Sequence, residues 1–76
     1  MKLSEARLEE KVIITKVGGD GSFHHRLLDM GLTKGQVIYI KNIAPFGDPI
    51  DIHVRGYELS IRLAEAKFIE VERISE

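Results

Sequence analysis

The residues best suited to chemistry lie in segment 47–62, where apolar and polar side chains alternate. Its polar side carries Asp51, His53, Glu58 and Ser60, side-chain types that serve in acid–base and nucleophilic sites. An imidazole opposite a carboxylate is, however, also an ordinary cross-strand pair on the solvated face of a hairpin. Acid–base catalysis needs a pocket and a second positioned group, and a small domain that fills its core has little room for one. We therefore predict no catalytic residues and no enzyme activity.

The histidines are the second set of candidate residues. His24 and His25 are adjacent, so on a helix they project about 100° apart and cannot hold one metal ion together. His25 and Asp29 lie one helical turn apart and could offer a nitrogen and an oxygen ligand, with His53 as a third. Nothing in the sequence brings these three together, so we predict no metal site and no bound cofactor.

The glycine-rich segment Gly18–Gly21 is a third candidate, for phosphate binding. It lies between a predicted strand and a predicted helix, which is the context of phosphate loops. The segment lacks a following Lys-Ser/Thr pair, and Asp20 places negative charge where a phosphate would lie. We interpret it as an ordinary turn that leads into a capped helix.

Length and composition restrict the chain to one small module. A chain of 76 residues buries only about 60% of its unfolded surface, so residues 1–76 are expected to form a single domain. The net charge of −1, without a long run of either sign, argues against a surface that neutralises nucleic-acid phosphates. Tyr57 and Arg55 could stack on bases. The neighbouring acids Asp48 and Glu58 would repel the nucleic-acid backbone, so we expect no nucleic-acid partner.

The sequence also indicates the cellular compartment. The chain has no cysteine, which removes disulfides, thiolate zinc sites and sulfur redox chemistry. The N-terminal segment MKLSEARLEEK has no apolar h-region, and no apolar run approaches the ~18 residues of a membrane span. We therefore expect a cytoplasmic protein that does not insert into membranes. Its oligomeric state is left open.

The alternating segment predicts its own register. With Arg55-Gly56 as a two-residue hairpin loop, all apolar side chains fall on one face. The predicted pairs are Ile50 with Ile61, Ile52 with Leu59 and Val54 with Tyr57 on the apolar face, and Asp51 with Ser60 and His53 with Glu58 on the polar face. A slip by one residue would expose the apolar set to water.

A helix over residues 22–30 is predicted by a buried stripe of Phe23, Leu27 and Met30, which Leu28 widens. Asp20 or Ser22 is the expected N-cap. At the other end, Gly31 suits a left-handed residue, and Leu32 can pack back on Leu27 as in a Schellman ending.

Strands complete the pattern at residues 11–17, 36–44 and 68–74, with a helical turn at 63–68. A first short helical turn is expected near the N-terminus, capped by Ser4, with Leu3 and Leu8 forming a hydrophobic staple. The fold class is therefore mainly β, with an antiparallel sheet curled into a small barrel, one helix outside it, and closure hiding the sheet edges.

Two segments carry a resemblance to a known family. Residues 26–35 read Leu-Leu-Asp-x-Gly-Leu-Thr-x-Gly after the first arginine, and residues 44–71 contain Ala-Pro-x-Gly-Asp-Pro followed by Val-Arg-Gly-Tyr-Glu-Leu-Ser. Together they closely resemble the ferrous iron transport protein A family, FeoA, over nearly the whole chain. The resemblance implies an SH3-like β-barrel with helical decoration.

The same resemblance implies a function. FeoA proteins are small, cytosolic, non-enzymatic accessories that act on the membrane ferrous-iron transporter FeoB, through its cytosolic GTPase-bearing part. Whether the effect activates or inhibits transport does not follow. Similar domains also end metal-dependent transcription repressors, after a DNA-binding domain. No helix-turn-helix pattern precedes the module here, so the alternative is a standalone metal-responsive SH3-like domain.

Two positions depart from the family pattern. Lys34 stands where proline is common, which loosens a turn. The sequence His24-His25-Arg26 stands where basic residues usually precede the Leu-Leu pair. Because histidine titrates near neutrality, this helix face is expected to respond to pH.

Candidate partner contacts are the charged and aromatic side chains left over once the core is assigned. Phe46, between Pro45 and Gly47 in a stiff loop, is the aromatic residue that periodicity does not place in the core. An apolar tip on a rigid loop loses little entropy on docking, although it could instead fold back over the barrel mouth. The predicted partner-binding residues are Arg26, Asp29, Phe46, Asp48, Arg55 and Tyr57.

Overall fold

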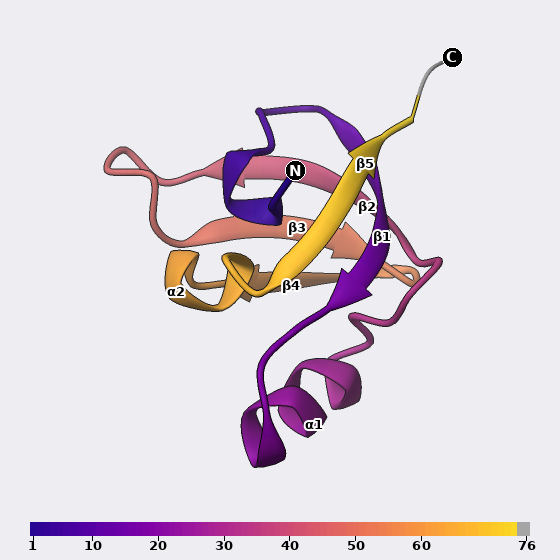
Figure 1. Ribbon diagram of the computed structural model, residues 1–76. Coiled ribbons are helices and arrows are strands. Elements are labelled where there is room, and N and C mark those ends of the chain that lie inside the picture. Colours follow the sequence, from indigo (N-terminus) through magenta and orange to yellow (C-terminus); the bar gives the residue numbers. More distant parts are fainter. Residues whose placement is uncertain (75–76) are drawn as a thin grey trace.

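The chain, described over residues 1–74 by a computed structural model, consists mainly of antiparallel strands (Figure 1). Along the sequence the elements are η1 (Leu3–Glu5), β1 (Lys11–Val17), α1 (Gly21–Asp29), β2 (Val37–Ile43), β3 (Ile50–Val54), β4 (Tyr57–Ile61), α2 (Leu63–Ala66) and β5 (Ile69–Arg73). The mainly-β prediction is confirmed, and the helix predicted over 22–30 is found one residue earlier.

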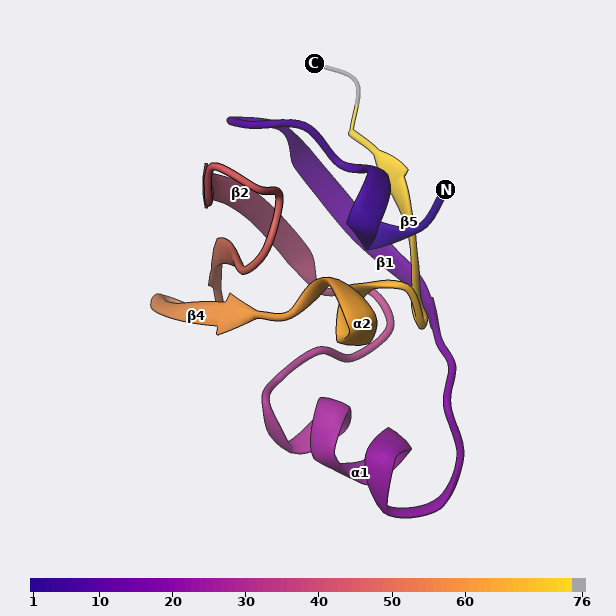
Figure 2. The ribbon, with the colours of Figure 1, turned by 90° about the vertical axis from the view of Figure 1, so that its left-hand side faces the viewer.

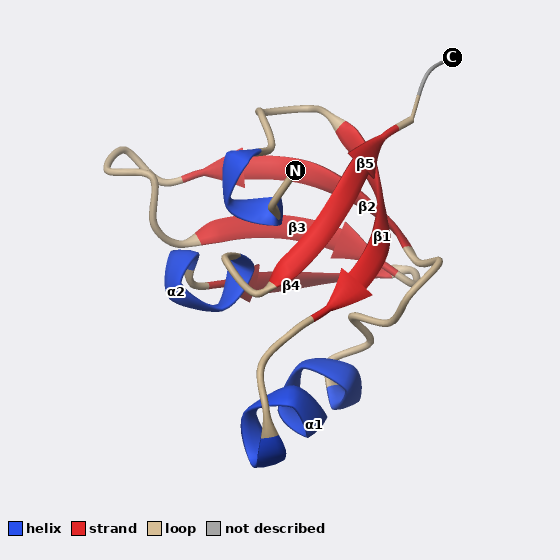
Figure 3. Cartoon of the chain, in the orientation of Figure 1, coloured by secondary structure: helices blue, strands red, loops and turns tan. Residues whose placement is uncertain are grey.

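The five strands form one sheet in the order β4-β3-β2-β1-β5. The sheet is strongly curled, so that β5 crosses in front of the other strands in Figure 1 and helices lie outside the strands in Figure 3. Figure 2 shows β4 and β5 on different sides of the molecule, with α2 between them. The curl gives the sheet one enclosed face, which is the core.

The two edges of the sheet differ, and the prediction that barrel closure hides both of them is wrong. Strands β4 and β5 are not hydrogen-bonded to each other. The N-terminal residue covers β5 instead, because the Val71 N–H donates to the Met1 carbonyl at 2.7 Å and the Met1 amino group donates to the Val71 carbonyl at 3.0 Å. Within residues 1–74, β4 carries no strand on its outer edge.

The core is made of small and branched aliphatic side chains from every strand and from the ends of the helices. Its fully buried members are Leu3, Val12, Leu27, Leu32, Ile38, Ile40, Ile52, Ile61, Ala66, Ile69 and Val71. No side-chain nitrogen or oxygen in the described chain is buried without a hydrogen-bond partner. Among the described residues, the buried polar or charged side chain is that of Glu65, which is 9% exposed.

The β3–β4 hairpin has the predicted register at all five cross-strand pairs. Its loop residues Arg55 and Gly56 both have positive φ, at 53° and 83°, as a type I′ turn requires. Tyr57 pairs with Val54 as predicted and is 42% exposed. The hydroxyl of Tyr57 donates to the Met30 carbonyl at the end of α1.

The end of α1 is the predicted Schellman motif. The Leu32 N–H donates to the Leu27 carbonyl at 3.2 Å, and the Gly31 N–H donates to the Leu28 carbonyl at 2.9 Å. Gly31 has a φ of +89°, and both Leu27 and Leu32 are completely buried. These bonds fix the direction in which the chain leaves the helix.

The beginnings of the two helical segments differ from the predictions. Asp20 is the N-cap residue of α1, but its side chain makes no capping hydrogen bond. The first turn begins at Leu3 with Lys2 as its N-cap, so Ser4 is not the cap. Leu8 is 52% exposed, so the expected staple with Leu3 does not form.

The hairpin leaves no room for a side chain at Gly31, just after the end of α1. A Cβ atom at this position would lie 2.6 Å from the Tyr57 hydroxyl oxygen and 3.1 Å from Cδ of Arg55. Gly35 has nearly the same φ, +90°, but nothing lies within 4 Å of its Cβ position. Substitutions at the two glycines therefore distinguish the cost of backbone strain, which both share, from the cost of steric crowding, which only Gly31 has.

We predict that Gly35→Ala lowers the free energy of unfolding by about 1–2 kcal/mol, the cost of a left-handed non-glycine residue. Gly31→Ala should lower it by about 1 kcal/mol more, because Tyr57 must also give up its bond to Met30. Urea denaturation of both variants measures the difference. Equal losses would contradict the close approach of the hairpin to α1.

Candidate functional site

The polar face of the hairpin is a set of side chains that bind one another. The Ser60 hydroxyl donates to the Asp51 carboxylate at 2.5 Å, and Lys41 on β2 forms an ion pair with Glu58. His53 is exposed and lies opposite Tyr39 on one side and Glu58 on the other. A shallow hollow of about 170 Å³ on this face is lined by Asp51, Glu58, Leu59 and Ser60, without His53. The arrangement is that of a solvated sheet face.

The histidine candidates lie in two separate places, His24 and His25 on α1 and His53 on β3. Nδ1 of His24 lies 3.0 Å from the Gly18 carbonyl, which ties the start of α1 to the chain after β1. The rings of His24 and His25 are 6.1 Å apart and inclined at 71°. Among residues 1–74, no group of three or more His, Cys, Asp or Glu side chains is close enough to hold a metal ion.

Arg26, one of the predicted partner contacts, is engaged within the domain. Its guanidinium pairs with Glu65 of α2, and it also lies over the Phe23 ring, 5.8 Å from the centroid. The ring of Phe23 meets Phe68 edge to face at 5.0 Å. Glu65 in turn accepts the Arg62 N–H at 3.1 Å. Arg26 therefore joins the two helices, although its side chain remains 61% exposed.

The loop between β2 and β3 holds Phe46 in solvent. The Phe46 side chain is 98% exposed, so it does not fold back over the barrel mouth. The Gly47 N–H donates to the Ala44 carbonyl at 2.7 Å, which closes the loop on itself. Asp48 accepts the Leu63 N–H at 2.9 Å and so attaches the loop to the start of α2.

The six predicted contacts lie in three places: the β2–β3 loop, the other end of β3, and α1. Phe46 and Asp48 lie in the loop that joins β2 to β3, on the left of Figure 1. Arg55 and Tyr57 lie at the other end of β3, and Tyr57 touches the end of α1. The remaining two, Arg26 and Asp29, are exposed on α1 itself.

Two surface hollows were not found by reasoning from the sequence. One of about 340 Å³ is lined by Glu9, Glu10, Lys11, Arg73 and Ile74. The other, of about 410 Å³, is lined by Thr15, Lys16, Val17, His24, Leu28 and Lys34. Each joins residues from separate elements, and no short motif in the sequence marks such a grouping.

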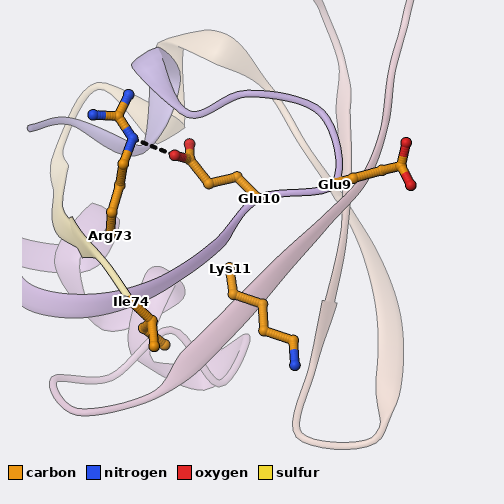
Figure 4. Close-up of a pocket in the computed structure, with 5 residues that line it drawn as sticks. All are labelled: Glu9, Glu10, Lys11, Arg73 and Ile74. Carbon is orange, nitrogen blue, oxygen red and sulfur yellow. Dashed lines mark hydrogen bonds and ion pairs between the residues drawn. The ribbon is translucent and has the colours of Figure 1, made fainter. Parts of the chain in front are cut away.

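The first hollow lies between the start of β1 and the end of β5, which are joined there by the Glu10–Arg73 ion pair (Figure 4). Glu10 accepts the Arg7 N–H at 2.9 Å and pairs with Arg73, while Glu9 points away. The Arg7 N–H, followed by Arg73, holds the pKa of Glu10 below its ordinary value of 4.5. The carboxylate is thus occupied by structural bonds.

This pKa shift predicts a pH dependence of stability. Because folding lowers the pKa of Glu10, its stabilising contribution is present at neutral pH and is lost as the pH falls below 4.5. Glu10→Gln should therefore have a lower free energy of unfolding than wild type at pH 7. Its free energy of unfolding should also fall less than that of wild type on acidification. Urea midpoints measured from pH 7 to pH 3 test this, with Glu9→Gln as the control. Parallel curves for wild type and Glu10→Gln would contradict it.

The curled five-stranded sheet, its aliphatic core and its peripheral helices define a small SH3-like barrel domain. The chain belongs to the FeoA family, whose domain model matches residues 1–73. No helix among residues 1–74 is both long enough and apolar enough to cross a bilayer.

Known proteins resemble the chain over nearly its whole length. It is 39% identical over 75 residues to an Fe(2+) transport protein A/Fe(2+) transporter FeoB fusion protein of Porphyromonas gingivalis, covering 99% of this chain and 9% of that relative. A FeoA-like protein of Clostridium acetobutylicum has a TM-score of 0.92 at 39% identity, with 100% and 88% of the two chains covered. The FeoA of Stenotrophomonas maltophilia, solved in complex with zinc, has a TM-score of 0.82 at 26% identity, with 95% and 89% covered. The structure of T. acidophilum IdeR, at 20% identity, a TM-score of 0.85 and 97% and 34% coverage, shares the fold alone.

Proposed function

We propose that this protein is a non-enzymatic, cytoplasmic accessory of ferrous iron uptake that binds the membrane transporter FeoB, at its cytosolic GTPase-bearing part, and modulates transport. The observation that carries the proposal is the Porphyromonas gingivalis relative, whose name joins transport protein A and FeoB in one chain. Fusion holds two domains at high effective concentration, which favours domains that work in contact. The present chain corresponds to 9% of that relative.

The Phe46 loop is the contact that we assign to this partner first. Because the Phe46 side chain is 98% exposed, a partner that binds it breaks no packing within the domain. Docking then buries the aromatic ring, which favours binding. The loop is held at its base by the Gly47 and Asp48 hydrogen bonds, so little conformational entropy is lost when a partner binds it. In this role Asp48 acts by fixing the loop.

A second contact surface is assigned to the other end of β3. Arg55 and Tyr57 lie beside the end of α1, where Asp29 and Arg26 are exposed. Tyrosine and arginine are the residue types that most often carry binding energy at interfaces. Because the Tyr57 hydroxyl is bound to Met30, its ring is held in place before a partner arrives.

The alternative, a standalone metal-responsive domain, is suggested only by a similarity of fold. The structure of T. acidophilum IdeR is similar in fold at 20% identity, which carries no statement about metal binding by this chain. Calorimetry with Fe²⁺ under anaerobic conditions distinguishes the two functions. Tight binding with a raised melting temperature would favour the metal-responsive role.

The accessory role predicts the outcome of one substitution. Phe46→Ala should weaken binding to the purified cytosolic part of FeoB at least tenfold, a loss of about 1.4 kcal/mol, because an interface anchor is removed. The melting temperature should be unchanged, because the side chain is 98% exposed. Isothermal titration calorimetry measures the affinity.

Leu8→Ala is the matched control, because Leu8 is a 52% exposed apolar residue that belongs to neither assigned contact surface. This variant should bind like wild type. If wild type shows no binding to the FeoB fragment, the accessory role is wrong. If Phe46→Ala binds as well as wild type, the role stands and the assignment to this loop is wrong.

A further inference from the structure

The groove of about 410 Å³ between α1 and β1 has no part in the contacts assigned so far. It is lined by Thr15, Lys16, Val17, His24, Leu28 and Lys34. Figure 1 shows α1 below the end of β1, with the chain after the helix returning beside that strand. The groove therefore has walls from a strand, a helix and a turn.

These walls are fixed by backbone hydrogen bonds. The Gly35 N–H donates to the Ile14 carbonyl at 2.8 Å, and the Ile14 N–H donates to the Gln36 carbonyl at 2.9 Å, so the turn that carries Lys34 is attached to β1. The pairing of β1 with β5 shifts register between Ile14 and Lys16, which places Thr15 in a bulge. Bulges re-aim side chains and are frequent at binding sites.

The ionisable side chains of the groove are two lysines and a histidine, without an acid. Neither Lys16 nor Lys34 forms an ion pair with another residue of the described chain. Glu70 lies opposite Lys16 in the sheet, but the two side chains do not form an ion pair. The other two hollows both contain acidic side chains. In a chain of net charge −1, this groove is thus a local concentration of positive charge.

The floor of the groove is apolar. Val17 and Leu28 are both partly buried and contribute aliphatic surface to the same lining as the two lysines. A small anion such as phosphate would satisfy the charges but leave this surface in water. A ligand that fits all of the groove needs an apolar group flanked by negative charges.

We propose that this groove docks an acidic peptide segment that carries one apolar anchor residue, such as leucine, between its carboxylates. The anchor would pack on Val17 and Leu28, and the carboxylates would lie near Lys16 and Lys34. Lysine is suited to this, because it is a mobile point charge that accepts carboxylates at several positions. The proposal rests on the proposed function in one respect: the segment would belong to FeoB.

An acidic protein segment fits better than a bilayer or a nucleic acid. On the adjacent strand β5, Glu70 and Glu72 pair with β1 residues, and their charge would repel an extended anionic surface. A short peptide meets less of this repulsion than an extended surface does, because only Glu70 lies opposite a lysine of the groove, Lys16, whereas Glu72 lies opposite Ile13. This comparison of charges decides between the occupants.

The test uses the ¹⁵N-labelled full chain and the peptide acetyl-Glu-Glu-Leu-Glu-Glu-amide as probe. We expect amide shifts centred on residues 15–17, Leu28 and Lys34, and no such shifts with acetyl-Lys-Lys-Leu-Lys-Lys-amide. Replacing the central leucine by alanine should weaken binding. Shifts centred elsewhere, or equal shifts with inorganic phosphate or phosphatidylglycerol vesicles, would overturn the proposal.

Charge reversal supplies the matched comparison. Lys34→Glu should weaken binding of the acidic peptide at least tenfold, because an attraction between charges becomes a repulsion. Arg7→Glu makes the same change in net charge on an exposed residue before β1, at the end of that strand away from the groove, and should leave the affinity unchanged. Equal weakening in both variants would show a general charge effect and refute the groove.

The same variants, titrated with the cytosolic part of FeoB, separate this inference from the proposed function. If FeoB binds wild type and Lys34→Glu equally, the groove is not its docking site and the accessory role stands. If the acidic peptide binds at the groove while FeoB does not bind the protein, the accessory role fails and the groove remains a peptide site.

Discussion

The curled sheet must bury a purely aliphatic core, and this constraint determines the rest of the molecule. With one small core in the chain, nearly every inward-facing position of the five strands is needed for branched aliphatic side chains. Polar side chains are therefore left to the outer face and to the connections. That is why the row of Asp51, His53, Glu58 and Ser60 is solvated and self-paired rather than gathered in a pocket.

The connections between strands then carry the side chains that hold the peripheral elements in place. Asp48 attaches the β2–β3 loop to α2, and Arg26 attaches α1 to Glu65 of the same short helix. Tyr57 closes the arrangement by binding the end of α1. Side chains that look free in the sequence thus hold the peripheral elements in place, and they present Phe46 and the α1–β1 groove on a rigid support.

A module of this kind suits the role proposed for a FeoA-family protein. Binding that modulates another protein needs exposed anchors and charged grooves on a rigid frame, and needs no cavity for a substrate. The β2–β3 loop lies well away from α1 and the end of β1 in Figure 1, so contacts at the Phe46 loop and at the groove on one partner would fix its orientation. A single contact would hold the partner close to this domain without setting its orientation.

The sequence by itself determined the elements whose signals are local. The period-two alternation and the Arg55-Gly56 turn specify the hairpin register, and Gly31 with Leu32 specifies the end of α1, because each depends on neighbours in the chain. Only the tertiary structure decided the placement of Tyr57, the pairing of Arg26 with Glu65, the Glu10–Arg73 ion pair and the groove. These features join residues from elements distant in sequence, and side-chain periodicity carries no information about which elements the curl of the sheet brings together.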